Sequence, residues 1–157
     1  MSGVRVTLKI ATSLDARIAL ADGTSQWITS SDSRARAHQL RAEHDAVLVG
    51  IGTVLADDPM LTARTVPMPK KQPVRIVADS SGRTPRHSRL VQSISSGPVV
   101  VATAGQPQDI LAASGVDIWR CGNGTRVDVT SLVRRAEGEG ITSILLEGGG
   151  TLAASFI

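Results

Sequence analysis

The stretch that decides the fold is Ile144–Ser155, which reads ILLEGGGTLAAS. An apolar run ends in the carboxylate of Glu147, and three glycines follow before a helix-compatible run begins at Thr151. This pattern is typical of a buried strand, a tight turn and a helix N-terminus. Glycines keep Cβ atoms out of a ligand's path, and free backbone N–H groups attract anions such as phosphate. The same pattern also occurs in plain strand-to-helix connections, so its meaning depends on the rest of the chain.

Strand and helix patterns alternate along the whole chain. Strands are expected at residues 4–10, 46–50, 74–78, 98–102, 116–119 and 141–147, where apolar side chains alternate or form short runs. Helical patterns lie between them at residues 32–44, 50–55, 109–113 and 128–137, and Ser30 or Ser31 can cap the first. This order predicts an α/β fold of three layers, a mainly parallel sheet with flanking helices.

Length and composition fit one globular domain over residues 1–157. No apolar run approaches the roughly 20 residues that a membrane span needs, and the first residues lack the apolar core of a secretory signal. The single cysteine, Cys121, cannot form an internal disulfide, and we expect a small apolar filler rather than part of a metal site. These features favour the reducing cytoplasm and no membrane partner.

The basic residues favour a small phosphorylated molecule as ligand. The net charge is +3, and only Lys9, Lys70 and Lys71 among the 17 basic residues are not arginine. Arginine presents a planar fork that matches phosphate and carboxylate groups. Nucleic acid is not expected as a partner, because the arginines are spread along the sequence and aromatic side chains for stacking on bases make up only 2% of the chain.

Polar residues and glycines follow four of the expected strands, at residues 11–15, 50–53, 79–80 and 147–151. Ligands bind outside the carboxyl ends of parallel strands, so these residues would line one polar site. No Ser-His-Asp arrangement or cysteine nucleophile falls in these loops, and we expect His38 and His44 to be ordinary helix-surface residues. Chemistry by a bound cofactor, with a nucleotide as the natural choice, is the economical interpretation.

The sequence leaves the role of some loop residues open. Trp27 is either core filler or a lid over a ligand, in a chain with almost no aromatic residues. Asp79-Ser80 is either an edge that binds sugar and phosphate or a plain Asx-type turn. The long loop before residue 73 shows no periodicity, and we expect Met60–Arg64 to be its ordered half and Pro67–Gln72 its mobile half.

Six motifs carry a resemblance to a known family. In chain order they are VTLKIATSLD (6–15), SQWIT (25–29), LRA (40–42), DAVLVGIGTV (45–54), DDPMLT (57–62) and LEGGGTL (146–152). With these motifs the chain resembles the reductase domain of riboflavin biosynthesis, the 5-amino-6-(5-phosphoribosylamino)uracil reductase, which has a dihydrofolate-reductase-like fold. The zinc motifs of the family's deaminase domain have no counterpart here, so the resemblance implies a chain that carries only the reductase.

The resemblance implies NADPH-dependent reduction of the substrate's ribose to a ribityl chain. It places the substrate, a small phosphorylated pyrimidine, at Ser25, Arg41, Leu61, Arg64 and Glu147. It places NADPH at Ala11, Trp27, Thr53, Asp57, Ser80, Gly149, Gly150, Thr151, Leu152, Ala153, Ala154 and Ser155. Lys9 is the candidate for polarising or protonating the reacting sugar nitrogen or oxygen, and Glu147 would orient the sugar hydroxyls or supply the proton. Ser80 and Arg83 are the local support for NADPH over NADH, because their side chains could bind a 2′-phosphate.

Two departures from the family pattern bear on these expectations. The usual Ser-Leu-Asp-Gly is Ser13-Leu14-Asp15-Ala16 here, so that turn must accommodate a Cβ. The family's domain normally continues past the glycine run with strands that complete the sheet and help form a homodimer. We therefore expect a C-terminally incomplete domain that lacks these strands. The alternatives are a related reductase for another pterin or pyrimidine, and a non-catalytic nucleotide-binding module.

Overall fold

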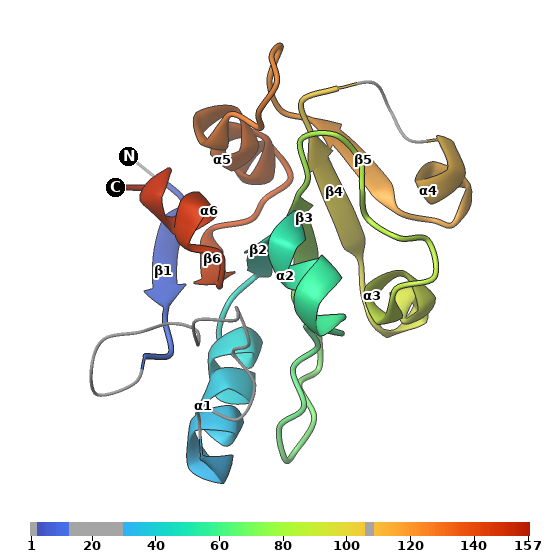
Figure 1. The fold of residues 1–157 in the computed structure, drawn as a ribbon. Helices are drawn as coiled ribbons and strands as arrows, with labels where there is room; N and C mark the ends of the chain where they lie inside the picture. The colour runs from blue at the N-terminus through green and yellow to red at the C-terminus, as the bar shows by residue number, and fades with distance from the viewer. Residues whose placement is uncertain (1–2, 13–29, 106–108) are drawn as a thin grey trace.

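The computed structural model describes residues 3–12, 30–105 and 109–157, and within these ranges it contains one six-stranded sheet (Figure 1). The strands are β1 (Arg5–Lys9), β2 (Ala46–Gly50), β3 (Val74–Ala78), β4 (Val99–Thr103), β5 (Asp117–Arg120) and β6 (Ser143–Glu147). The helices are α1 (Ser31–Ala42), α2 (Ile51–Asp57), α3 (Arg89–Gln92), the 3₁₀ helix η1 (Ile94–Ser96), α4 (Asp109–Ala113), α5 (Val129–Gly138) and α6 (Gly150–Ala154). The strand order is β1-β6-β2-β3-β4-β5 and every pairing is parallel, which confirms the expected α/β fold.

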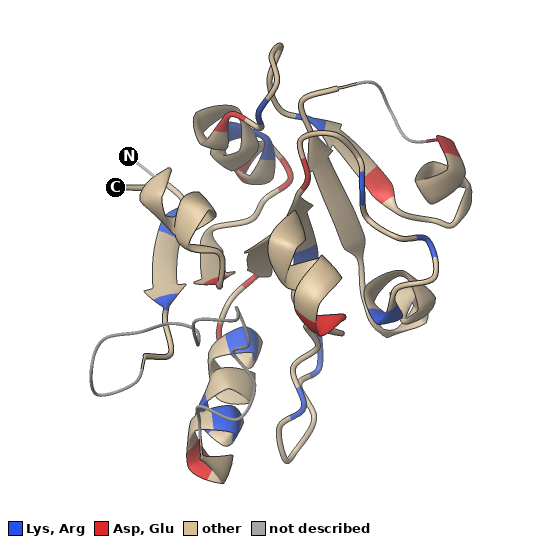
Figure 2. Ribbon diagram, viewed as in Figure 1, with Lys and Arg blue, Asp and Glu red and all other residues tan. Residues whose placement is uncertain are grey.

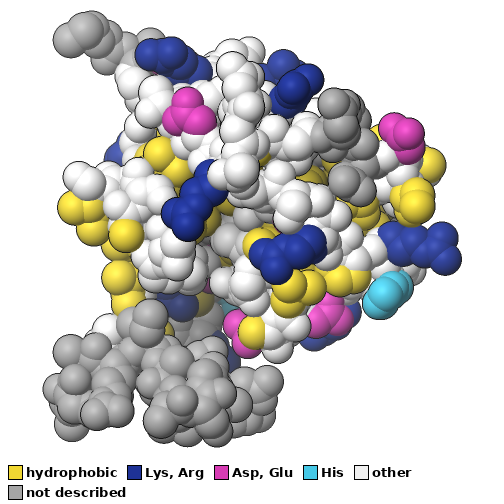
Figure 3. All heavy atoms as spheres, turned by 45° about the horizontal axis from the view of Figure 1, so that its top comes forward, with side chains coloured by type: hydrophobic (Ala, Val, Ile, Leu, Met, Phe, Trp, Pro, Cys, Tyr) yellow, Lys and Arg dark blue, Asp and Glu magenta, His cyan; other side chains and the backbone are white. Residues whose placement is uncertain are grey.

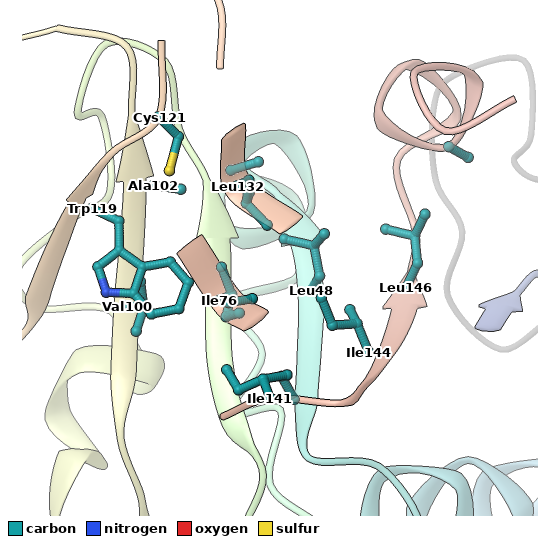
Figure 4. Close-up of a cluster of buried hydrophobic side chains, with 14 residues drawn as sticks. Leu48, Ile76, Val100, Ala102, Trp119, Cys121, Leu132, Ile141, Ile144 and Leu146 are labelled. Atoms are coloured by element: carbon teal, nitrogen blue, oxygen red, sulfur yellow. The ribbon is translucent and has the colours of Figure 1, made fainter. Parts of the chain in front are cut away.

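Apolar side chains alternate across the sheet and build a core on each face. In β2 all of Ala46–Val49 is fully buried, with successive residues in opposite cores. The first core lies between the sheet and helices α5 and α6, and includes Leu132 and Ala153 (Figure 4). The second core includes Val54 of α2, Leu90 of α3 and Leu111 of α4. The expected three layers are therefore present.

Cys121 is fully buried in the first core, where Figure 4 shows it beside Ala102. Burial raises the pKa of its thiol above the ordinary value, which keeps the sulfur neutral and unreactive. Cys121 is thus the small apolar filler that the sequence predicts.

Side-chain hydrogen bonds begin the two longest helices. The Oγ of Ser30 accepts from the backbone N of Ser33 at 3.2 Å, which confirms the predicted cap of α1, and Asp128 caps α5 in the same way. The sequence contains no sign of α3 and η1, because helices of four and three residues are too short to show a helical period.

The surface carries no single concentration of positive charge on the face that Figure 3 presents, where Lys and Arg side chains lie apart from one another. Figure 2 shows the same scatter along the ribbon, from α1 to α5. Within the described ranges, no helix has the length and apolar character to cross a membrane. The same residues include no group of three or more His, Cys, Asp or Glu side chains that could hold a metal ion.

Helix α1 is unusual because none of its residues is buried. In Figure 1 it projects away from the sheet, whereas α5 and α6 lie against it. A helix normally docks by burying an apolar stripe. Polar contacts at the C-terminal half of α1 must therefore hold it in place.

Asp45 joins the start of β2 to the start of β6. Its Oδ2 accepts from the backbone N and the hydroxyl of both Thr142 and Ser143, at distances between 2.7 and 3.0 Å. The hydrogen bonds from Thr142, and then those from Ser143, lower the pKa of Asp45 below its ordinary value of 3.8. A lowered pKa in the folded state means that this contribution to stability is present at neutral pH and is lost as the pH falls through it.

We predict that Asp45→Ala lowers the free energy of unfolding by about 2 kcal/mol at pH 7, because four donors lose a charged acceptor. Urea unfolding at a series of pH values measures the loss. The difference from the wild type should shrink as the pH falls below 3.8, the ordinary value for Asp45. Glu137→Ala, at an exposed position on α5, is the control and should change little. A difference that stays constant down to acid unfolding would contradict the assigned role.

Candidate active site

The two predicted catalytic residues lie side by side at the carboxyl edge of the sheet. Lys9 ends β1 and Glu147 ends β6, and the two are register partners in adjacent parallel strands. Neighbouring strands are about 4.8 Å apart, and register partners point to the same face. The sheet therefore places a lysine and a glutamate in neighbouring positions although they are 138 residues apart in the sequence (147 − 9 = 138).

Arg41 of α1 reaches across to Glu147 in a bidentate ion pair. Its Nε lies 2.6 Å from Oε1 and its Nη2 lies 2.8 Å from Oε2. The side chains are only 14% and 9% exposed, so water screens the pair weakly. Arg41 also donates through Nη1 to the carbonyl of Thr62 at 3.2 Å. One guanidinium thus connects the helix, the end of β6 and the loop after α2.

Two further side chains, those of Gln72 and Arg75, hold the loop at residues 60–64 by hydrogen bonds to its backbone. Gln72 accepts from the backbone N of Ala63 and donates to its carbonyl, both at 2.8 Å, and Arg75 donates to the carbonyl of Met60 at 3.0 Å. Leu61 adopts a left-handed φ of 56° and is only 3% exposed. Because its side chain packs into the second core, Leu61 offers a ligand little besides its backbone.

Gln72 is held by hydrogen bonds at the end of Pro67–Gln72, the half of the loop that was expected to be mobile. The amide of Gln72 replaces a strand partner for Ala63, with one donor and one acceptor in the positions of a backbone pair. The contact joins residues nine apart, across a loop with no sequence periodicity. No local sequence pattern predicts this contact between Gln72 and Ala63.

His38 lies inside the site, so the expectation of an ordinary helix-surface residue is wrong for it. Its Nδ1 is 3.1 Å from the carbonyl of Thr62, and its Nε2 is 3.3 Å from Nη2 of Arg64. Burial, then the charges of Arg41 and Arg64, lower the pKa of His38 below its ordinary value of 6.5. The signal was present in the sequence, because a residue three positions before Arg41 shares its face of the helix.

His44 is also misassigned by the sequence. It is 8% exposed and bridges α1 and β1, with Nδ1 2.7 Å from the carbonyl of Leu40 and Nε2 2.9 Å from the hydroxyl of Thr7. The carbonyl can only accept, so Nδ1 carries a proton, and Nε2 hydrogen-bonds with the Thr7 hydroxyl. His44 is therefore a buried structural link beneath the site.

Two glycine turns pack against each other beside Glu147. Gly148 and Gly149 have φ values of 75° and 85°, a backbone region that side chains with a Cβ rarely adopt. A Cβ on Gly148 would lie 3.1 Å from the hydroxyl of Thr53 on α2, while Leu152 of α6 packs over Gly50. Residues 148–151 are exposed. The two turns form an open cradle, and a side chain at Gly148 would intrude on it.

A groove of about 430 Å³ adjoins this edge between the end of β1 and helix α1. Its lining includes Lys9 and Ala11 from the β1 side, and Ser33 and Leu40 from α1. Ala11 therefore lies in the same groove as the candidate catalytic lysine. Ser25 and Trp27, which were expected to border the same space, lie outside the described residues, as does the turn at Ser13–Ala16.

The remaining predicted cofactor positions differ in accessibility. Asp57 is exposed at the end of α2, and Ala153 is only 9% exposed because it packs into the first core. The hydroxyl of Ser80 accepts from the backbone N of Val127 at 3.0 Å. Ser80 keeps its own hydroxyl hydrogen for another acceptor.

Asp79 decides between the two interpretations of the Asp79-Ser80 edge. Its side chain is fully buried, and its Oδ2 accepts from the backbone N of Thr84 at 2.7 Å and from the Thr84 hydroxyl at 2.8 Å. These bonds close the loop after β3. Asp79 thus has the structural role of the turn, and only Ser80 remains available at this edge.

Comparison with known proteins gives consistent results. A family model described as the RibD C-terminal domain matches residues 4–157. The riboflavin biosynthesis protein RibD of Actinobacillus pleuropneumoniae is 43% identical over 152 residues, which cover 94% of this chain and 40% of that protein. The 2,5-diamino-6-ribosylamino-4(3H)-pyrimidinone 5′-phosphate reductase of Methanothermobacter thermautotrophicus is 40% identical over 154 residues, 97% of this chain and 70% of that protein.

A solved structure agrees with the sequence matches. The diaminohydroxyphosphoribosylaminopyrimidine deaminase/5-amino-6-(5-phosphoribosylamino)uracil reductase of Thermotoga maritima superposes with a TM-score of 0.82 and 32% identity. The match covers 98% of this chain and 41% of that one. The chain therefore spans about two fifths of the length of such bifunctional relatives, and the expected dihydrofolate-reductase-like fold is confirmed.

The low exposure of the Arg41–Glu147 pair leads to a prediction about its strength. A double-mutant cycle of Arg41→Ala and Glu147→Ala should give a coupling energy of about 2–3 kcal/mol in urea unfolding, because the pair is bidentate and nearly dry. Arg36 and Glu43 form a matched control pair, at 3.1 Å with side chains 57% and 55% exposed. Their cycle should give less than about 1 kcal/mol. Equal coupling in both cycles would show that burial adds nothing.

Proposed function

The chain belongs to the family described as the RibD C-terminal domain, and on that premise we propose that residues 1–157 form an NADPH-dependent reductase domain of riboflavin biosynthesis. It converts the ribose of 5-amino-6-(5-phosphoribosylamino)uracil into a ribityl chain. The observation that carries the proposal is the meeting of Lys9, Glu147 and Arg41 at one edge of the sheet, directly beside a glycine cradle.

Arg64 is the main phosphate-binding group in the proposal. It is exposed and forms no ion pair with any described acidic residue, so its charge is available to a ligand. Arg41 has less to offer, because Glu147 and Thr62 already take three of its donors. Its role is to fix Glu147 and to add positive potential. Ser25 and the backbone of Leu61 complete the proposed substrate contacts.

The residues around the glycine cradle suit a dinucleotide. The open turn at residues 148–151 presents backbone rather than side chains, and Thr53 offers a hydroxyl beside it. Ala11, Trp27, Asp57 and the segment Gly149–Ser155 complete the proposed NADPH contacts, with Ala153 limited to its backbone. Ser80 and the exposed Arg83 are placed at the 2′-phosphate. When bound, the reduced nicotinamide supplies the hydride for the sugar.

The chain's own chemistry in the proposal is divided between Lys9 and Glu147. Lys9 donates a hydrogen bond or a proton to the sugar nitrogen or oxygen as the ribose is reduced. Glu147 is paired with Arg41 through both oxygens, an arrangement that favours accepting hydrogen bonds from sugar hydroxyls over supplying a proton. The ion pair thereby orients the substrate against the cofactor.

The Methanothermobacter relative is named for a different pyrimidine ring on the same ribose phosphate. The proposal therefore assigns binding of the phosphoribosyl group to the site residues. An assay that compares both substrates tests which pyrimidine ring the enzyme accepts. Among the described strands, β1 has one unpaired edge; Leu8 of β1 is 40% exposed, and Ile10, just after the strand, is 54% exposed. An apolar edge of this kind is usually covered, which supports the homodimer of the proposal. The cytoplasm is the proposed compartment.

Arg64→Ala tests the phosphate assignment. We expect the KM for the phosphorylated substrate to rise about 10- to 100-fold, because a charge-assisted contact is lost, while kcat changes little. The KM for NADPH is the internal control and should not move. An unchanged KM for the phosphorylated substrate would remove Arg64 from the site. If nicotinamide fluorescence showed no binding of NADPH to the wild type, the proposed reductase activity would be contradicted.

Lys9→Gln tests the catalytic assignment. We expect kcat to fall about 100- to 10,000-fold, since a positioned proton donor is replaced by a neutral amide of similar length. Binding of NADPH, measured by nicotinamide fluorescence, should be retained. Unchanged turnover would mean that positioning alone accounts for the reaction and that Lys9 has no catalytic role.

A further inference from the structure

The contacts of His38 determine its protonation state. The carbonyl of Thr62, 3.1 Å from Nδ1, can only accept, so Nδ1 carries a proton. The guanidinium of Arg64, 3.3 Å from Nε2, can only donate, so Nε2 carries a lone pair. Both contacts form only in the neutral Nδ1–H tautomer. The other tautomer would keep a single weak contact, from the backbone N of Arg64 to Nδ1 at 3.3 Å.

His38 is the main described contact of the Arg64 guanidinium. The other is the sulfur of Met60, 3.9 Å from Nη1, which is a weak acceptor. An exposed arginine carries about 2 kcal/mol of rotamer entropy, so an unheld Arg64 would sample many positions. The imidazole restricts it to the side of the site where Arg41 and Glu147 lie.

The charges facing His38 come from three elements. Arg41 lies on its own helix, Arg64 on the loop after α2, and Glu147 at the end of β6. The two arginines and burial disfavour the charged imidazole, and the carbonyl of Thr62 and the carboxylate of Glu147 favour it, with the net pKa lowered. His38 is therefore neutral at pH 7, in agreement with the hydrogen bonds.

We propose that His38 is a positioning residue that holds Arg64 for the substrate phosphate, and that it does so only as the neutral Nδ1–H tautomer. The inference rests on the proposed function, because it takes Arg64 as the phosphate ligand. Protonation of Nε2 removes the acceptor and places a third positive charge beside Arg41 and Arg64. The affinity for the phosphorylated substrate then falls as the pH drops below 6.5, the ordinary value for histidine.

The test compares His38→Gln and His38→Ala with the wild type between about pH 5.5 and 8, a range that spans the ordinary histidine pKa. Glutamine carries a donor and an acceptor on neighbouring atoms and does not titrate. His38→Gln should match the wild-type KM at the upper end, and His38→Ala should raise it about tenfold there. Towards acid, the wild-type KM should rise about tenfold relative to His38→Gln.

Three controls separate positioning from a structural role. The second phosphate pKa, near 6, affects every variant equally, so only differences between variants are interpreted. His87→Gln, at an exposed position before α3, should follow the wild type. With the substrate lacking its 5′-phosphate, His38→Ala and the wild type should have the same KM. An equal loss with both substrates would overturn the proposal, as would a wild-type KM that falls towards acid relative to His38→Gln.

Nuclear magnetic resonance of the protein without substrate separates this proposal from the proposed function. The ring nitrogen shifts of His38 should report the Nδ1–H tautomer, and the Nε–H of Arg64 should become more mobile in His38→Ala and in the wild type at acid pH. An Nε2–H tautomer, or an Arg64 indifferent to His38, would overturn the positioning role. If the expected shifts are seen but the protein shows no turnover, the proposed reductase activity is refuted, while the contact between His38 and Arg64 is supported.

Discussion

The ion pair between Arg41 and Glu147 is the interaction on which the site depends. Helix α1 has no fully buried residue, so apolar burial contributes little to fixing its position. The bidentate pair, with the link from His44 to Thr7, performs that task instead. Since Gly148 follows Glu147 directly, the same contact that docks the helix also sets the start of the glycine cradle. The proposed substrate and cofactor sides of the site thus share one fixed point.

The main effect of such an ion pair is to fix the orientation of the two side chains rather than to add stability. Removing two charges from water is costly, and well-packed apolar residues often do as well in energy. Two parallel hydrogen bonds, however, allow only one orientation of the guanidinium relative to the carboxylate. Directional hydrogen bonds also hold the loop at residues 60–64. Arg41 bonds to the backbone of Thr62, Gln72 to that of Ala63 and Arg75 to that of Met60. Backbone carbonyls and amides are fixed one by one, and Leu61 keeps its left-handed conformation.

The periodicity of apolar residues and the residue types typical of turns predicted most of the fold and the positions of the glycine turns, because those signals are local. The short runs at β2 and β3 and the cap at Ser30 needed no partner to be recognised. The errors concern side chains whose role is set by distant partners. The sequence places His38 and His44 on a helix surface, whereas contacts with Thr62 and Thr7 make His38 half-buried and His44 buried. For Asp79, where the sequence left two interpretations open, the hydrogen bond from the backbone N of Thr84 indicates the structural one.

The strand order explains why the pairing of Lys9 with Glu147 could not be derived from the sequence by local rules. β6, the last strand described, inserts between β1 and β2, the first two. Register in a parallel sheet is set by long-range contacts, and a slip by one residue would turn Glu147 to the opposite face, away from Arg41. The site therefore exists only after β6 is in place. Such a non-local pairing joins positions far apart in the sequence, which is why no local pattern could predict the candidate site.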